Sequence, residues 1–129
     1  MKIAIYQGEG LPAKVDENLE IMRRFAFSAA RQQADLIIFP ELFLTGYNIG
    51  SAAHSLAEPA DGPSYQKAAE IARKADIALL YGYSERLGTD VYNAALLIDR
   101  KGRARANYRK THLYGSYEKN TSNPGIRSS

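Results

Sequence analysis

The sequence contains no cysteine, and this absence excludes several kinds of chemistry at once. A chain without cysteine forms no disulfide, builds no thiolate metal site and offers no cysteine nucleophile. Histidine is also scarce, because His54 and His112 are the only two in the chain and lie far apart. With only two histidines, the chain offers few residues from which a Ser-His-Asp triad or a histidine-based metal site could be built. We therefore expect neither a metal nor a cofactor.

Long apolar runs are absent too, since none approaches the ~20 residues that a membrane-spanning helix needs. The opening residues, MKIAIYQGEG, have an apolar core too short for a signal peptide. A hydrophobic fraction of 45% and a charged fraction of 24% are typical of a globular protein. The formal charge of +3 demands no polyanionic partner. We expect a cytoplasmic protein that binds neither nucleic acid nor a membrane.

Apolar periodicity predicts five strands and two long helices in 129 residues, which is enough for one domain. One helix is expected from a cap at or near Asp16 to about residue 33, and a second from a proline-containing loop to Ala75. The order β-α-β-α-β-β-β predicts an α/β fold with parallel early strands and antiparallel later hairpins. The predicted strands cover residues 2–7, 36–39, 77–83, 91–99 and 104–109.

The end of the chain differs in composition from the rest. Residues 116–129 are rich in serine, asparagine and glycine and have almost no apolar content. Such a composition is typical of a frayed terminus. We therefore predict a domain over residues 1–115 followed by an irregular tail over residues 116–129.

Two segments raise the question of phosphate or nucleic-acid binding. GEGLP, at residues 8–12, follows a strand but lacks the third glycine of a dinucleotide loop, and Pro12 interrupts the approach to the helix. RKGRARANYRK, at residues 100–110, has six basic residues in eleven. A nucleic-acid surface is one interpretation. We favour the other, a hairpin that carries Arg103 and Arg105 on its solvated face.

Glu41 and Lys110 each lie next to a predicted strand end. Glu41 follows the apolar strand at residues 36–39, and Lys110 is predicted just beyond the strand at residues 104–109. Ligand sites in α/β sheets form outside the carboxyl ends of strands, so this acid and this base could face one cleft. A salt bridge that closes the sheet edge is the structural alternative. The spacing alone does not choose between them.

Two long motifs, in order, carry a family resemblance. FPELFLTGY at residues 39–47 resembles the glutamate motif of the nitrilase (carbon–nitrogen hydrolase) superfamily, and YRKTHLYG at residues 108–115 resembles its lysine motif. The opening KIAIYQGEG and the YNAA at residues 92–95 are also similar to that family. Within it, the chain is most similar to small aliphatic amidases. The resemblance implies the amino-terminal half of an αββα sandwich.

The resemblance also implies a reaction and roles for three residues. The family hydrolyses a nonpeptide C–N bond of a small amide or nitrile by attack of a cysteine thiol. Carried over residue by residue, Glu41 is the general base and Lys110 the cation that stabilises the tetrahedral stage. Glu118 is the second glutamate, which orients substrate and lysine.

The chain departs from the family in having no nucleophile. The family cysteine follows a later strand, and no serine here has the context of a nucleophile elbow. We therefore expect a truncated hydrolase that is inactive alone. Half of a sandwich also leaves apolar sheet surface uncovered, so homo-oligomer formation or self-association is expected. The alternatives are a non-catalytic interaction protein that reuses the fold and one subunit of a split hydrolase.

Overall fold

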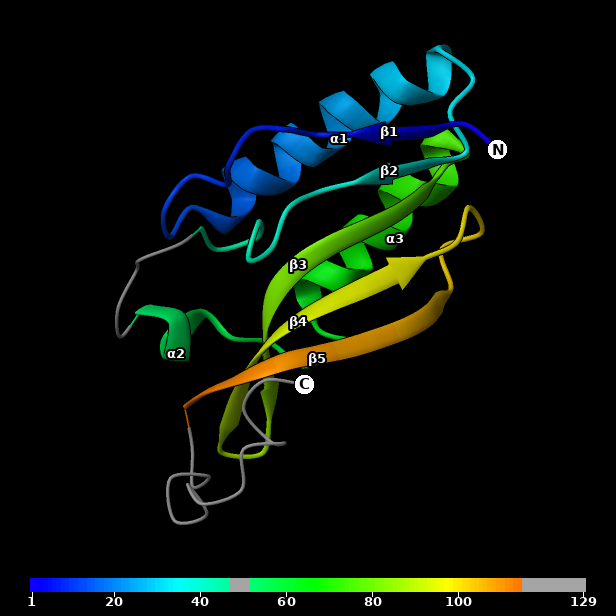
Figure 1. Cartoon of the computed structure of the whole chain (residues 1–129). Helices are drawn as coiled ribbons and strands as arrows, with labels where there is room; N and C mark the ends of the chain where they lie inside the picture. Colours follow the sequence, from blue (N-terminus) through cyan, green and yellow to red (C-terminus); the bar gives the residue numbers. More distant parts are fainter. Residues whose placement is uncertain (47–51, 115–129) are drawn as a thin grey trace.

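Five strands form a single mixed sheet in which spatial order follows sequence order (Figure 1). The computed structural model describes residues 1–46 and 52–114. β1, β2 and β3 run parallel, and β4 and β5 extend the sheet as antiparallel neighbours. The α/β class and the predicted order of five strands are confirmed. The strands are β1 (Ile3–Ile5), β2 (Leu36–Ile38), β3 (Ala78–Leu87), β4 (Asp90–Ile98) and β5 (Ala104–Tyr114).

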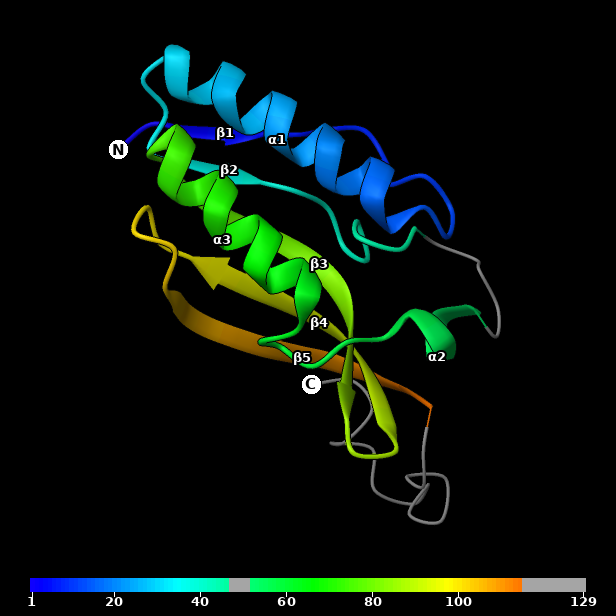
Figure 2. The ribbon, with the colours of Figure 1, turned by 180° about the vertical axis from the view of Figure 1, so that it is seen from behind.

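Two long helices, α1 (Val15–Arg31) and α3 (Pro63–Ala75), cover one face of the sheet (Figures 1 and 2). Parallel neighbours need a crossover connection, and these helices lie in the two crossovers of the parallel strands. Their alanine-rich and aliphatic stripes face the sheet as the periodicity predicts. α1 buries Leu19, Met22, Ala26 and Ala29, and α3 buries Ala68, Ala69, Ala72 and Ala75. Within residues 1–46 and 52–114, no helix is long and apolar enough to cross a membrane.

The helix starts follow the sequence signals in part. α3 begins at Pro63, so the predicted proline start is confirmed. α1 begins at Val15 with Lys14 at the N-cap and no side-chain capping bond. Asp16 therefore lies in the first turn, where its charge still favours the helix dipole, rather than at the cap. A short helix, α2 (Ala52–Leu56), was not predicted, because five residues carry too little periodicity to be recognised.

β3 and β5 are longer than the sequence predicts, and the length of β5 corrects the position of Lys110. β5 continues to Tyr114, so Lys110 lies inside the strand rather than beyond its end. The reason is β4, whose backbone keeps pairing through Asn93↔Thr111 and Tyr92↔His112 despite bulges in the register. Backbone pairing thus extends the strand through a stretch whose polar side chains predicted its end.

The sheet face opposite α1 and α3 carries a continuous apolar row. Ile5, Ile38, Leu80, Leu97 and Ala106 stand in register across all five strands. Paired residues share a face of the sheet. No helix in the described part of the chain covers this face, which Figure 1 turns toward the viewer. We call it the open face. Ile5 is 63% exposed there.

The open face generates a prediction about association. Contiguous exposed apolar surface drives self-association, so we expect the chain to sediment as a species larger than a monomer at micromolar concentration. Ile5→Lys should shift it toward the monomer in analytical ultracentrifugation. Leu87→Lys is the matched control, because Leu87 is also exposed (48%) but lies at the far end of β3, outside the row. A sharp monomer that unfolds cooperatively would contradict the prediction.

Candidate active site

Glu41 is presented by a turn that lies against β3. The Phe39 amide donates a hydrogen bond to the Leu80 carbonyl at 2.8 Å, and the Leu44 amide donates to the Gly82 carbonyl at 3.1 Å. Phe43 and Leu44 are buried at 0% and 2% exposure. The apolar residues on both sides of Glu41 therefore anchor the turn in the core. The Glu41 side chain, between these anchors, remains 33% exposed.

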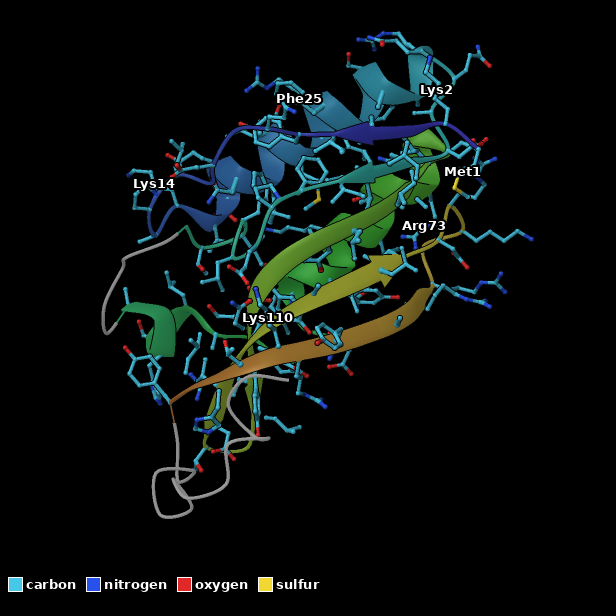
Figure 3. The ribbon with its side chains drawn as sticks, viewed as in Figure 1. Met1, Lys2, Lys14, Phe25, Arg73 and Lys110 are labelled. Carbon is cyan, nitrogen blue, oxygen red and sulfur yellow. The ribbon has the colours of Figure 1, made fainter. Side chains whose placement is uncertain are left out.

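Lys110 meets Glu41 directly. Its Nζ donates a hydrogen bond to Glu41 Oε2 at 2.7 Å, although the two residues are 69 positions apart. Figure 3 labels Lys110 on β5. β5 runs in the same direction as β2, so both residues come from the carboxyl-terminal part of the sheet. The expected proximity of this acid and this base is confirmed. The hydrogen bond to Glu41, and next the Glu41 charge, raise the pKa of Lys110 above its ordinary value.

A small cavity of about 180 Å³ adjoins the pair. Glu41, Lys110, Asn93 and Tyr108 supply its polar lining. The remainder is mostly apolar and includes Ile38, Phe39, Leu80 and Ala95. This volume is below the ~300–1,000 Å³ typical of drug-sized ligand sites. The arrangement suits a small molecule with an apolar part next to an acid and a base.

An ion pair on the opposite face of the sheet holds β5 beneath Lys110. The Arg109 guanidinium donates two hydrogen bonds to the Glu85 carboxylate, at 2.8 and 2.9 Å. Glu85 is 2% exposed, and its hydrogen bonds raise the pKa of Arg109. Tyr83 donates from its hydroxyl to Asn107 Oδ1 at 2.6 Å and so makes a second link from β3 to β5. Both links pass over β4, which lies between the two strands.

Sequence reasoning missed this pair, although a signal was available. In the sequence, Arg109 stands out only as one of six basic residues in its segment. Neighbouring residues in a strand point to opposite faces. Once Lys110 faces the site, Arg109 must face the other way, toward the face on which β3 buries the Glu85 carboxylate, and a buried carboxylate needs a cationic partner.

The other candidate segments lie apart from the pair. Arg103 and Arg105 are exposed and contact Asp99 at 3.1 and 3.6 Å, in agreement with the hairpin interpretation. In the part of the chain that the structure describes, no group of acidic or histidine side chains is placed to hold a metal. Glu118 lies outside the described residues, as does the predicted tail over residues 116–129.

The comparison with known families settles the class of the protein. The carbon–nitrogen hydrolase family profile matches residues 2–127. The chain therefore belongs to the carbon–nitrogen hydrolase family.

Individual relatives agree with this assignment. A Pseudomonas protegens protein named for its position, "Hydrolase in pqqF 5'region", is 48% identical over 92% of this chain and 41% of its own length. An (R)-stereoselective amidase from a Pseudomonas sp. is 33% identical over 98% of this chain and 45% of its own length. The chain thus spans less than half the length of these relatives.

A solved structure reproduces the fold. An amidase from Nesterenkonia sp. superposes with a TM-score of 0.77 at 31% identity, over 92% of this chain and 46% of that protein. Other structures of the Nesterenkonia amidase include a variant in complex with butyramide. A further variant shows covalent addition of the acetamide moiety of fluoroacetamide at the active-site cysteine.

The Glu41–Lys110 contact predicts a pH-dependent effect. The pKa of Lys110 is raised in the folded chain, so the contact stabilises the fold below the ordinary lysine pKa and loses its effect as pH rises through the raised one. Glu41→Gln should shift the pH profile of Lys110 acetylation, read by trace labelling and peptide mass spectrometry, to lower pH. Glu70→Gln is the matched control, because Glu70 pairs with Lys74 at 3.1 Å on the surface. An unchanged Lys110 profile in Glu41→Gln would show that the contact is absent in solution.

The buried Glu85 carboxylate predicts a stability effect. Arg109→Ala leaves it without its bidentate partner, and breaking a fully buried ion pair costs roughly 3–5 kcal/mol. Arg109 is 41% exposed, so water screens the pair and we expect a loss of about 2 kcal/mol in the free energy of unfolding. Arg105→Ala is the control and should cost less than about 1 kcal/mol, since that residue makes an exposed contact. Equal losses in urea denaturation would contradict the assignment.

Proposed function

We propose that this chain supplies the general base and the stabilising cation of an amidase-type active site that hydrolyses the C–N bond of a small aliphatic amide. The observation that carries the proposal is the 2.7 Å contact between Lys110 and Glu41, made by the two motif residues beside a small, largely apolar cavity. The relatives named as amidases support the substrate class. Nitriles, the other substrates of the superfamily, are the alternative.

The two residues divide the chemistry between them. Glu41 accepts the proton of a cysteine thiol as the sulfur attacks the amide carbonyl, and then delivers it to the departing ammonia. Lys110 neutralises the negative charge that builds on the carbonyl oxygen at the tetrahedral stage. One such fixed donor is worth roughly 3–4 kcal/mol in a dry site. Water then hydrolyses the thioester and releases the acid, with Glu41 as base. By family resemblance, Glu118 orients the lysine and the substrate.

The thiol has to come from elsewhere, because the 129 residues contain no cysteine. The open face favours a second polypeptide segment that covers the sheet and brings the nucleophile. One subunit of a split hydrolase fits this requirement. A non-catalytic interaction protein would use the same face but would not depend on Glu41 or Lys110.

Alone, the chain should release no ammonia from short aliphatic amides such as butyramide or acrylamide. The reason is the missing thiol, since neither Glu41 nor Lys110 can form the acyl intermediate of this mechanism. An ammonia assay on purified protein tests this. Turnover that persists through repurification and disappears in Glu41→Gln would mean that another nucleophile operates and would overturn the mechanism.

A chimera tests the function itself. Residues 1–127 would replace the matching segment of the Pseudomonas protegens hydrolase, which is 48% identical, so that the remainder of that protein completes the fold. We expect the chimera to hydrolyse short amides, and Glu41→Gln and Lys110→Met each to lower kcat/KM by about 100-fold or more. Glu70→Gln and Lys74→Met form the matched pair of controls, because they alter a surface ion pair of the same type. Full activity in both site variants would refute the proposal.

A further inference from the structure

The turn that carries Glu41 lies directly on β3 at Gly82, with no side chain between them. A Cβ built on Gly82 would stand 2.7 Å from the Pro40 carbonyl oxygen and 2.8 Å from Glu41 Cα, and it would overlap the Leu42 amide nitrogen even more closely. All three are backbone atoms, so no change of rotamer relieves the overlap. The turn can occupy this position only because residue 82 is glycine.

The same turn is held from its other side by the first turn of α1 and by the loop that precedes this helix. Asn18 is fully buried, and its Nδ2 donates hydrogen bonds to the Leu11 and Leu44 carbonyls, both at 2.9 Å. A Cβ on Gly10 would run into the Phe43 carbonyl. The turn therefore lies between β3 on one side and the start of α1 with its preceding loop on the other, and both contacts fix its position.

The turn also adopts a backbone conformation that needs such support. Leu42 has a φ of +53°, in the left-handed region that residues with a side chain seldom occupy. A strained backbone conformation of this kind persists where several surrounding contacts hold it in place. The contacts with Gly82 and Asn18 are of this kind, and they lie next to Glu41 rather than at a remote loop.

We propose that Gly82 is a positioning residue for Glu41: its missing side chain seats the Glu41 turn on β3 and so sets the carboxylate opposite Lys110. The proposal rests on the proposed function for its catalytic meaning, since Glu41 matters there as the base. A methyl group at position 82 must lift the turn from β3. A displacement of ~1 Å along the contact with Lys110 would stretch it from 2.7 Å beyond hydrogen-bond length.

The test reads the contact through Lys110 in the full chain. We would compare the pH profile of trace acetylation at Lys110 in the unmodified chain, Gly82→Ala and Glu41→Gln, with circular dichroism to confirm the fold of each. Gly82→Ala should move the Lys110 profile to lower pH by a shift similar to that of Glu41→Gln, because both remove the same acceptor. A folded Gly82→Ala variant with an unchanged Lys110 profile would overturn the proposal.

Gly88→Ala is the matched control for a general loss of stability. Gly88 has a φ of +64° and a Cβ there would meet nothing within 4 Å, so the change strains the backbone without touching the Glu41 turn. It should leave the Lys110 profile unchanged. A shift in Gly88→Ala equal to that in Gly82→Ala would show that any destabilisation moves the Lys110 profile. That result would overturn the positioning role of Gly82.

A second measurement keeps the proposal testable if Gly82→Ala does not fold. Amide hydrogen exchange of the unmodified chain should show the Phe39 and Leu44 amides exchanging as slowly as those of β3, since both are bonded to β3 carbonyls. Fast exchange at these two amides would contradict the contact between the turn and β3. Neither measurement depends on turnover, so a failed positioning role is distinguishable from a failed chimera assay.

Discussion

Both halves of the Glu41–Lys110 contact are positioned from β3, the central strand of the sheet. On one side, β3 pairs in parallel with β2, and its carbonyls at Leu80 and Gly82 hold the segment that carries Glu41. On the other side, it pairs with β4, which in turn sets the register of β5 and of Lys110. A one-residue slip in either ladder would turn every side chain of that strand to the other face. The site thus depends on backbone pairing before it depends on any charge.

The ion pair does not stabilise the fold enough to explain its presence. Lys110 is 54% exposed, and exposed pairs contribute little to stability because water screens them and side-chain entropy is lost. The Glu85–Arg109 pair is different. Glu85 is 2% exposed, so removing its partner would leave a buried carboxylate unpaired and would lower the stability of the fold. Two ion pairs that involve adjacent residues of β5 therefore differ in kind. Arg109 holds the strand, whereas Lys110 is left accessible to another molecule.

Local patterns in the sequence predict the elements of this fold better than its contacts. The aliphatic periodicity of α1 and the apolar run of β2 specify their positions, because burial against the sheet follows the same spacing. The end of β5 could not be predicted, since pairing with β4 continues through polar residues such as Thr111. The contact between the Glu41 turn and Gly82 could not be predicted either, because a glycine within a strand does not show which backbone segment will pack against it. Glu41 and Lys110 were found through their motifs, and strand order explains why they meet.

The open face and the candidate site are parts of one surface, and this links association to chemistry. Ile38 and Leu80 belong to the apolar row and also line the cavity beside Glu41 and Lys110. Tyr108, in the neighbouring row, is 56% exposed and lines the same cavity. A segment that buries the apolar row would also close one side of the cavity and exclude water from the Glu41–Lys110 ion pair. Coulomb interactions strengthen several-fold as the effective dielectric falls. The apolar surface that would drive association would therefore also set how strongly Lys110 interacts with a charge in the cavity, because both depend on excluding water from the same face.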